Sequence, residues 1–76
     1  MNQIIKDYAD KYNITIIKSK QTNGNIAFCN NGTAKERREN FYSFWNAINH
    51  YAEPRCGLYT YTDEIGRECE KIALFF

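Results

Sequence analysis

The sequence predicts an α+β fold in which a four-stranded antiparallel sheet carries two helices packed on one face. The expected element order is α-β-β-α-β-β. Two segments repeat apolar residues with helical spacing, and each is followed by two β-rich runs that are separated by turn residues. The 76 residues are near the lower size limit for a self-supporting core, so we expect a single small domain over residues 1–76.

The first helix is predicted over residues 2–12. An apolar stripe runs along one side of a helix of about three turns, while charged residues occupy the rest of its surface. The stripe consists of Ile4, Ile5, Tyr8 and Tyr12.

The first β-hairpin is predicted over residues 14–29. Its opening residues are rich in β-branched side chains, which favour a strand. Asn23-Gly24 is the typical pair for a type I′ turn, in which both central residues need a positive φ. This turn predicts strands over residues 14–21 and 25–29.

The second helix is predicted over residues 34–52. Thr33 and Glu36 have the spacing of a capping box, in which each side chain bonds to the backbone N–H of the other residue. Pro54 sets the far limit because it disfavours helix at the residue before it. The apolar stripe of this helix is expected in the core and consists of Phe41, Phe44, Trp45 and Ile48.

The second hairpin is predicted over residues 57–76. The segment Asp63–Gly66 suits a turn with glycine in the left-handed conformation. The segment from Ile72 to Phe76 is apolar on both faces, which indicates a buried central strand.

Several function classes find no support in the sequence. No apolar run is long enough to span a membrane, and the first residues mix charged and apolar groups in a way that does not resemble a signal peptide. The odd number of cysteines, without a C-x-x-C pair, favours reduced thiols in a cytoplasmic protein. Cys29, His50, Cys56 and Cys69 lack the close spacing of zinc ligands. We therefore expect no metal, no cofactor and no enzymatic activity.

Charge is unevenly distributed along the chain, although the net charge is only +1. Residues 1–38 carry seven Lys and Arg against three Asp and Glu, while residues 39–76 carry three against six. The acidic half concentrates four carboxylates on the second hairpin. These candidate binding residues are Asp63, Glu64, Glu68 and Glu70. Such a hairpin suits a cationic groove that normally receives nucleic acid.

A second set of candidate binding residues is aromatic and polar. Tyr42, Asn46 and His50 fall outside the apolar stripe of the second helix, as do Asn49 and Tyr51. Tyr59 and Tyr61 lie in a predicted strand and are candidate anchors or stacking platforms. A boundary position at the edge of the core is the alternative role for these side chains.

Two alternative functions depend on basic residues. A nucleic-acid-binding regulator would use a basic end formed by the first hairpin and the start of the second helix, with residues Lys18, Lys20, Lys35, Arg37 and Arg38. A small ribonuclease would combine His50 with arginines such as Arg37 and Arg38.

The leading hypothesis is a non-enzymatic protein-binding module. Asn, Ile, Lys, Tyr and Phe supply 35 of the 76 residues, a usage typical of AT-rich bacterial and phage genes. Size, composition and the acidic hairpin are similar in general character to small phage or mobile-element inhibitors of nucleic-acid-processing or defence complexes, anti-CRISPR proteins among them. The expected partner is therefore a host nucleic-acid-binding protein in a bacterial cytoplasm. A homodimer joined through the oppositely charged halves stays open.

Overall fold

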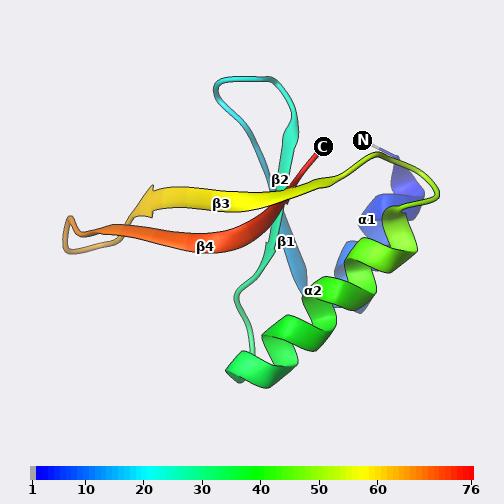
Figure 1. Ribbon diagram of the computed structural model, residues 1–76, viewed down its shortest axis with the longest axis horizontal. Coiled ribbons are helices and arrows are strands. Elements are labelled where there is room, and N and C mark those ends of the chain that lie inside the picture. Colours follow the sequence, from blue (N-terminus) through cyan, green and yellow to red (C-terminus); the bar gives the residue numbers. More distant parts are fainter. Residues whose placement is uncertain (1) are drawn as a thin grey trace.

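A computed structural model describes residues 2–76 and contains two helices and four strands in the predicted order. The elements are α1 (Gln3–Lys11), β1 (Ile14–Lys18), β2 (Asn25–Cys29), α2 (Ala34–Ile48), β3 (Arg55–Thr62) and β4 (Glu68–Phe75). The strands form one antiparallel sheet in the order β1-β2-β4-β3, and both helices pack on one of its faces (Figure 1). The predicted α+β fold of a single small domain is confirmed.

Short polar side chains determine where α1 begins and where the chain turns after it. The Asn2 side chain accepts a hydrogen bond from the Ile4 N–H at 2.8 Å and so caps a free donor of the first turn. Asn13 adopts a positive φ of 56°, a left-handed conformation that asparagine tolerates better than most residues. The helix therefore stops at Lys11, and the chain reverses directly into β1.

The turn between β1 and β2 differs from the prediction. Strand β1 ends at Lys18 instead of residue 21. Asn23 has a positive φ but Gly24 does not, so the prediction of a type I′ turn was wrong. The Ser19 N–H donates to the Gly24 carbonyl at 2.8 Å and closes a longer loop. A Cβ at Gly24 would lie 3.3 Å from the carbonyl oxygen of Phe76, a tight contact, so the loop packs closely against that residue.

The predicted capping box is present at the start of α2. The Thr33 hydroxyl accepts from the Glu36 N–H at 3.2 Å, and the Glu36 carboxylate accepts from the Thr33 N–H at 3.1 Å. The helix ends at Ile48, four residues before the predicted end, and the N–H groups of Tyr51 and Ala52 both donate to its carbonyl. Asn49, His50 and Tyr51 are exposed, and Ala52 packs against the main core from the turn that follows the helix.

The main core lies between the helices and the sheet. Phe44, Ile48 and Leu74 are its largest fully buried side chains, and Phe41 is nearly as buried. Trp45, which was predicted in the core, is only half-buried and stacks on the exposed Tyr42 ring at a centroid distance of 6.0 Å. Trp45 thus packs at the edge of the main core, and the buried stripe of α2 consists of Phe41, Phe44 and Ile48.

A second, smaller core lies on the sheet face that carries no helix. It consists of Ile26, Phe28 and Ala73, with Ile17, Tyr59 and Phe75 packed against them. The sheet twists strongly, so that the hairpin of β3 and β4 crosses the hairpin of β1 and β2 at a wide angle (Figure 1). These side chains bury one another on a face of the sheet that no helix covers.

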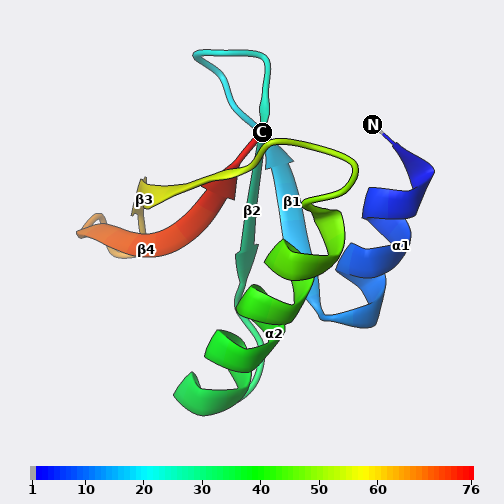
Figure 2. The same cartoon turned by 45° about the vertical axis from the view of Figure 1, so that its right-hand side comes forward.

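Strand β4 is central, as its apolar end predicts, yet it pairs very unequally with its neighbours. Eight residue pairs join it to β3, whereas only Ile26↔Phe75 and Ala27↔Leu74 join it to β2. Most of the β3–β4 hairpin therefore projects away from the helices (Figures 1 and 2). Strand β3 begins at Arg55, two residues earlier than predicted.

Candidate functional site

The projecting hairpin exposes one face from its turn as far as Leu58 and Ile72. Residues on this face alternate with those of the opposite face, as expected for strands, and they are Leu58, Thr60, Thr62, Glu68, Glu70 and Ile72. Leu58 and Ile72 oppose each other across the two strands, with exposed fractions of 59% and 53%. We call this surface the acidic–apolar face, because two carboxylates lie beside an uncovered apolar pair.

The four predicted acidic residues do not act as one group. Glu68 and Glu70 lie on the acidic–apolar face, and Glu64 is exposed in the turn. The Asp63 carboxylate is occupied inside the turn, where it accepts hydrogen bonds from the Arg67 N–H at 2.8 Å and the Ile65 N–H at 3.1 Å, and pairs with the Arg67 guanidinium at 3.1 Å. The backbone bond from Arg67 is the main reason why the pKa of Asp63 is lowered. Asp63 thus shapes the hairpin and is not free for a partner.

Tyr59 and Tyr61 lie on the opposite face of the hairpin and are half-buried. The Tyr59 ring stacks between those of Phe28 and Tyr61, at centroid distances of 5.6 and 5.8 Å. The Lys71 ammonium lies over Phe28 at 4.2 Å and over Tyr61 at 4.5 Å. This aromatic row stiffens the projecting hairpin, which is a structural role that the sequence pattern did not indicate.

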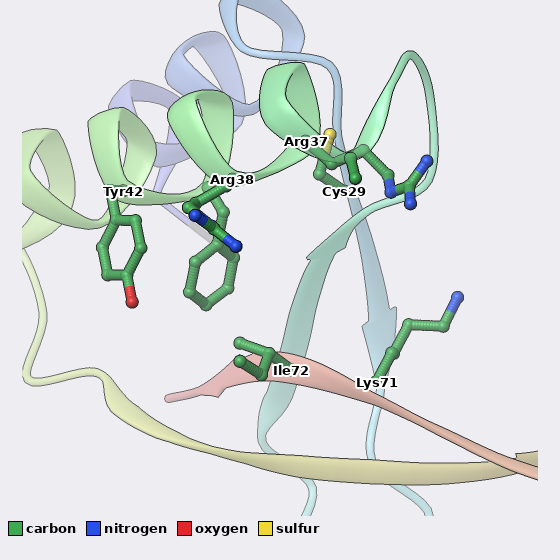
Figure 3. Close-up of a pocket in the computed structure, with 8 residues that line it drawn as sticks. Cys29, Arg37, Arg38, Tyr42, Lys71 and Ile72 are labelled. Carbon is green, nitrogen blue, oxygen red and sulfur yellow. The ribbon is translucent and has the colours of Figure 1, made fainter.

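A cleft opens where β2 and β4 separate. Continuing the register of Ala27↔Leu74 would pair Cys29 with Ile72, but these residues instead lie on opposite walls of a cavity of about 270 Å³. The first turns of α2 contribute Arg37, Arg38 and Tyr42 to the same cavity (Figure 3). We call it the β2–β4 cleft, and its labelled lining residues are Cys29, Arg37, Arg38, Tyr42, Lys71 and Ile72.

Three cationic side chains line this cleft. Arg37 and Lys71 extend toward each other from α2 and β4, whereas Arg38 lies apart from them, on the side of Tyr42 (Figure 3). The Arg37 guanidinium also donates a hydrogen bond to the Gly32 carbonyl at 2.7 Å. The Lys71 ammonium donates a hydrogen bond to the Asn30 side chain. Burial is the main cause that lowers the pKa of Lys71, and the charge of Arg37 adds to it. Sequence reasoning found both arginines but missed Lys71, because its approach depends on the twist of the sheet.

The predicted basic end is divided between two ends of the molecule. Lys18 and Lys20 lie at the loop between β1 and β2, where they border a groove of about 500 Å³ whose far wall contains Tyr59. Lys35 lies with Arg37 and Arg38 at the start of α2, at the other end of β2 (Figure 2). The five residues therefore do not form one continuous surface.

Asn46 and His50 line a shallow groove between α1 and α2, together with Tyr8 and Tyr12. Tyr42 lies apart from them, at the β2–β4 cleft. Arg37 and His50 mark opposite ends of α2, roughly 20 Å apart at the rise of an α-helix. Of the arginines considered for a ribonuclease together with His50 (Arg37, Arg38 and Arg55), Arg37 and Arg38 thus lie far from that histidine.

Known proteins and simple site patterns give no further identification. Within residues 2–76, no helix is long and apolar enough to cross a membrane, and no three His, Cys, Asp or Glu side chains gather as metal ligands. Comparison of the chain with protein-family models, curated proteins and solved structures finds no match.

Proposed function

We propose that the protein is a non-enzymatic protein-binding module and that the acidic–apolar face of the β3–β4 hairpin is its recognition surface. The observation that supports this proposal is the exposed pair Leu58 and Ile72 beside Glu68 and Glu70. Isolated exposed apolar residues are ordinary, but an adjacent pair on a projecting hairpin with a charged border has the composition of an interface centre and its rim.

The free edge of β3 adds to this surface. The Asp63 N–H donates to the Arg67 carbonyl, so in this antiparallel ladder the odd-numbered residues of β3 bond toward β4. Backbone groups of the even-numbered residues, Leu58 and Thr60 among them, therefore face outward. The strand contains neither Pro nor Lys, the residues that commonly protect a sheet edge. A partner strand that added here would gain backbone hydrogen bonds beside the apolar pair.

The carboxylates select the kind of partner. Glu68 and Glu70 favour a basic surface, and proteins that handle nucleic acid present such surfaces. We propose that the partner is a bacterial nucleic-acid-processing or defence complex and that binding of the hairpin competes with its nucleic acid. The protein would then act as an inhibitor of the kind encoded by phages and mobile elements.

A capture experiment with charge-reversed variants tests the proposal. Tagged protein is incubated with bacterial lysate, and the retained proteins are compared between wild type and the double variant Glu68→Lys/Glu70→Lys. We expect one partner with a basic surface to be retained by wild type, and its affinity to fall at least tenfold in the double variant.

The matched control reverses two exposed carboxylates elsewhere, Glu39→Lys/Glu53→Lys. It makes the same change in net charge, and we expect it to retain the partner. Equal loss in both double variants would show a general charge effect, and unchanged binding by Glu68→Lys/Glu70→Lys would exclude the acidic–apolar face.

A further inference from the structure

The β2–β4 cleft shares Ile72 with the acidic–apolar face, but its cationic lining suits a ligand other than the basic partner proposed for that face. Arg37, Arg38 and Lys71 line it, but within residues 2–76 none of them forms an ion pair with a carboxylate. Nearby Glu36 is held in the capping box by Thr33. Three like charges around one small cavity repel one another, so an anion that entered the cleft would be stabilised.

The chemistry of the three cations favours phosphate. Arg38 offers a planar guanidinium that matches two oxygens of one phosphate group. Lys71 is held in place by Asn30 and by the Phe28 and Tyr61 rings, so ordering it on binding costs little entropy. Because the cations come from two separate elements, they surround a compact group with more than one negative charge better than a single carboxylate.

The remaining wall of the cleft is flat and apolar. Tyr42 is 49% exposed and lines the cleft, and its ring stacks on Trp45 with ring planes 17° apart. Phe41 and Ile72 complete this wall. Nucleic-acid bases stack on exposed aromatic rings of this kind.

We propose that the β2–β4 cleft binds a nucleotide, with the phosphate held by the cationic side chains that line the cleft and the base against Tyr42. The ligand is either a free mononucleotide or one unit of a single-stranded nucleic acid, since both present the same phosphate and ring. Ile72 is common to this site and the acidic–apolar face, but Glu68 and Glu70 do not line the cleft. Reversal of these two carboxylates therefore tests the protein-binding function without removing a contact to the nucleotide.

Trp45 provides the readout, because it is the single tryptophan of the chain and stacks on Tyr42. Its fluorescence is titrated at low salt with adenosine, inorganic phosphate, adenosine monophosphate and a single-stranded oligonucleotide. We expect adenosine monophosphate to bind at least tenfold more tightly than adenosine, and its affinity to fall as salt is raised. Tighter binding of the oligonucleotide would identify nucleic acid as the natural source, and weaker binding would identify free nucleotide.

Substitutions locate the site. Arg38→Gln and Lys71→Gln should each weaken binding of adenosine monophosphate at least tenfold, whereas Lys71→Arg should retain it. Lys35→Gln is the matched control, since it removes the same charge from the first turn of α2 outside the cleft. Circular dichroism checks that each variant is folded, and Arg38→Gln, which removes an exposed side chain, leaves the aromatic row intact.

Three results would overturn the inference. The first is equal affinity for adenosine and adenosine monophosphate, or no response to any phosphate-bearing probe. The second is binding that Arg38→Gln weakens no more than Lys35→Gln does. Loss of binding in Glu68→Lys/Glu70→Lys alone would also contradict it, because those carboxylates do not line the cleft.

Discussion

The two β-hairpins have the same antiparallel pairing but opposite surroundings. The β1–β2 hairpin lies beneath α1 and α2 and supplies Ile14 and Ala27 to the main core. The β3–β4 hairpin reaches that core only near its end, at Leu74, and the rest projects into solvent. The first hairpin is thus part of the packed scaffold. The second is anchored to the core at one end, and the rest of its length is accessible to a partner.

The projecting hairpin compensates for the missing helix with its own side chains. Phe28, Tyr59 and Tyr61 stack in a row, and Lys71 lies over two of these rings. In the turn, the Asp63 carboxylate and the positive φ of Gly66 determine where the chain reverses. One face of the hairpin is therefore used for rigidity, which leaves the other face for recognition.

Leu74→Ala should give the largest effect. Leu74 is fully buried where the projecting hairpin enters the main core, so the substitution creates a cavity and should lower the free energy of unfolding by about 3 kcal/mol. Leu58→Ala makes the same change in the same hairpin on an exposed residue, and we expect an effect within about 0.5 kcal/mol. Urea unfolding measures both, and equal losses would contradict the view that the hairpin is anchored only at its end.

Tyr59→Ala should give the next largest loss of stability. It removes the central ring of the aromatic row and both stacked pairs, for an expected loss of about 2 kcal/mol. Amide hydrogen exchange should quicken in β3 and β4 while β1 and the helices stay protected. If protection fell uniformly over the chain, the row would belong to the main core and the two hairpins would not differ as described.

Thr33→Ala should cost less, because it removes only the cap of α2. We expect about 1 kcal/mol, measured by thermal or urea unfolding, from the loss of the hydroxyl that accepts from the Glu36 N–H. Thr33→Ser keeps that acceptor and should restore most of the stability. The projecting hairpin should keep its turn resonances in both variants.

Acid should weaken the turn of the projecting hairpin. Hydrogen bonds from Arg67 lower the folded pKa of Asp63, while the unfolded value is about 3.9. The ionised carboxylate therefore adds stability above the unfolded pKa, and this stability is lost as the pH falls through the folded pKa. The stability difference between wild type and Asp63→Asn should be present at neutral pH and vanish in strong acid. If the difference in stability persisted at a pH where Asp63 is protonated, the ionised carboxylate would not be its cause, and the difference would be assigned to the backbone of the turn.

Local patterns in the sequence predicted the elements but missed several boundaries. The capping box at Thr33 was sufficient to locate the start of α2, since both bonds are formed by neighbours in the chain. The predicted end of α2 and the predicted turn after β1 were wrong, because both depend on contacts with residues distant in the sequence. Gly24, for example, lies against the carbonyl of Phe76, which no local pattern reveals.

The candidate site was predicted in part. Glu68 and Glu70 were found as an acidic pair, and strand alternation places both on one face. Asp63 was grouped with them because proximity in the sequence does not show that its carboxylate is bonded within the turn. The five basic residues were grouped for the same reason, although β2 separates them.

By itself, the sequence determined the α+β class, the element order, the cap of α2 and the central position of β4, because periodicity, capping and uninterrupted apolar runs act over a few residues. Only the tertiary structure decided how far β4 pairs with β2. That early separation leaves the β3–β4 hairpin projecting, exposes Leu58 and Ile72, and opens the cleft that Lys71 lines together with Arg37 and Arg38. Sheet twist is the physical reason, since it accumulates over the whole sheet and has no signature in any short segment.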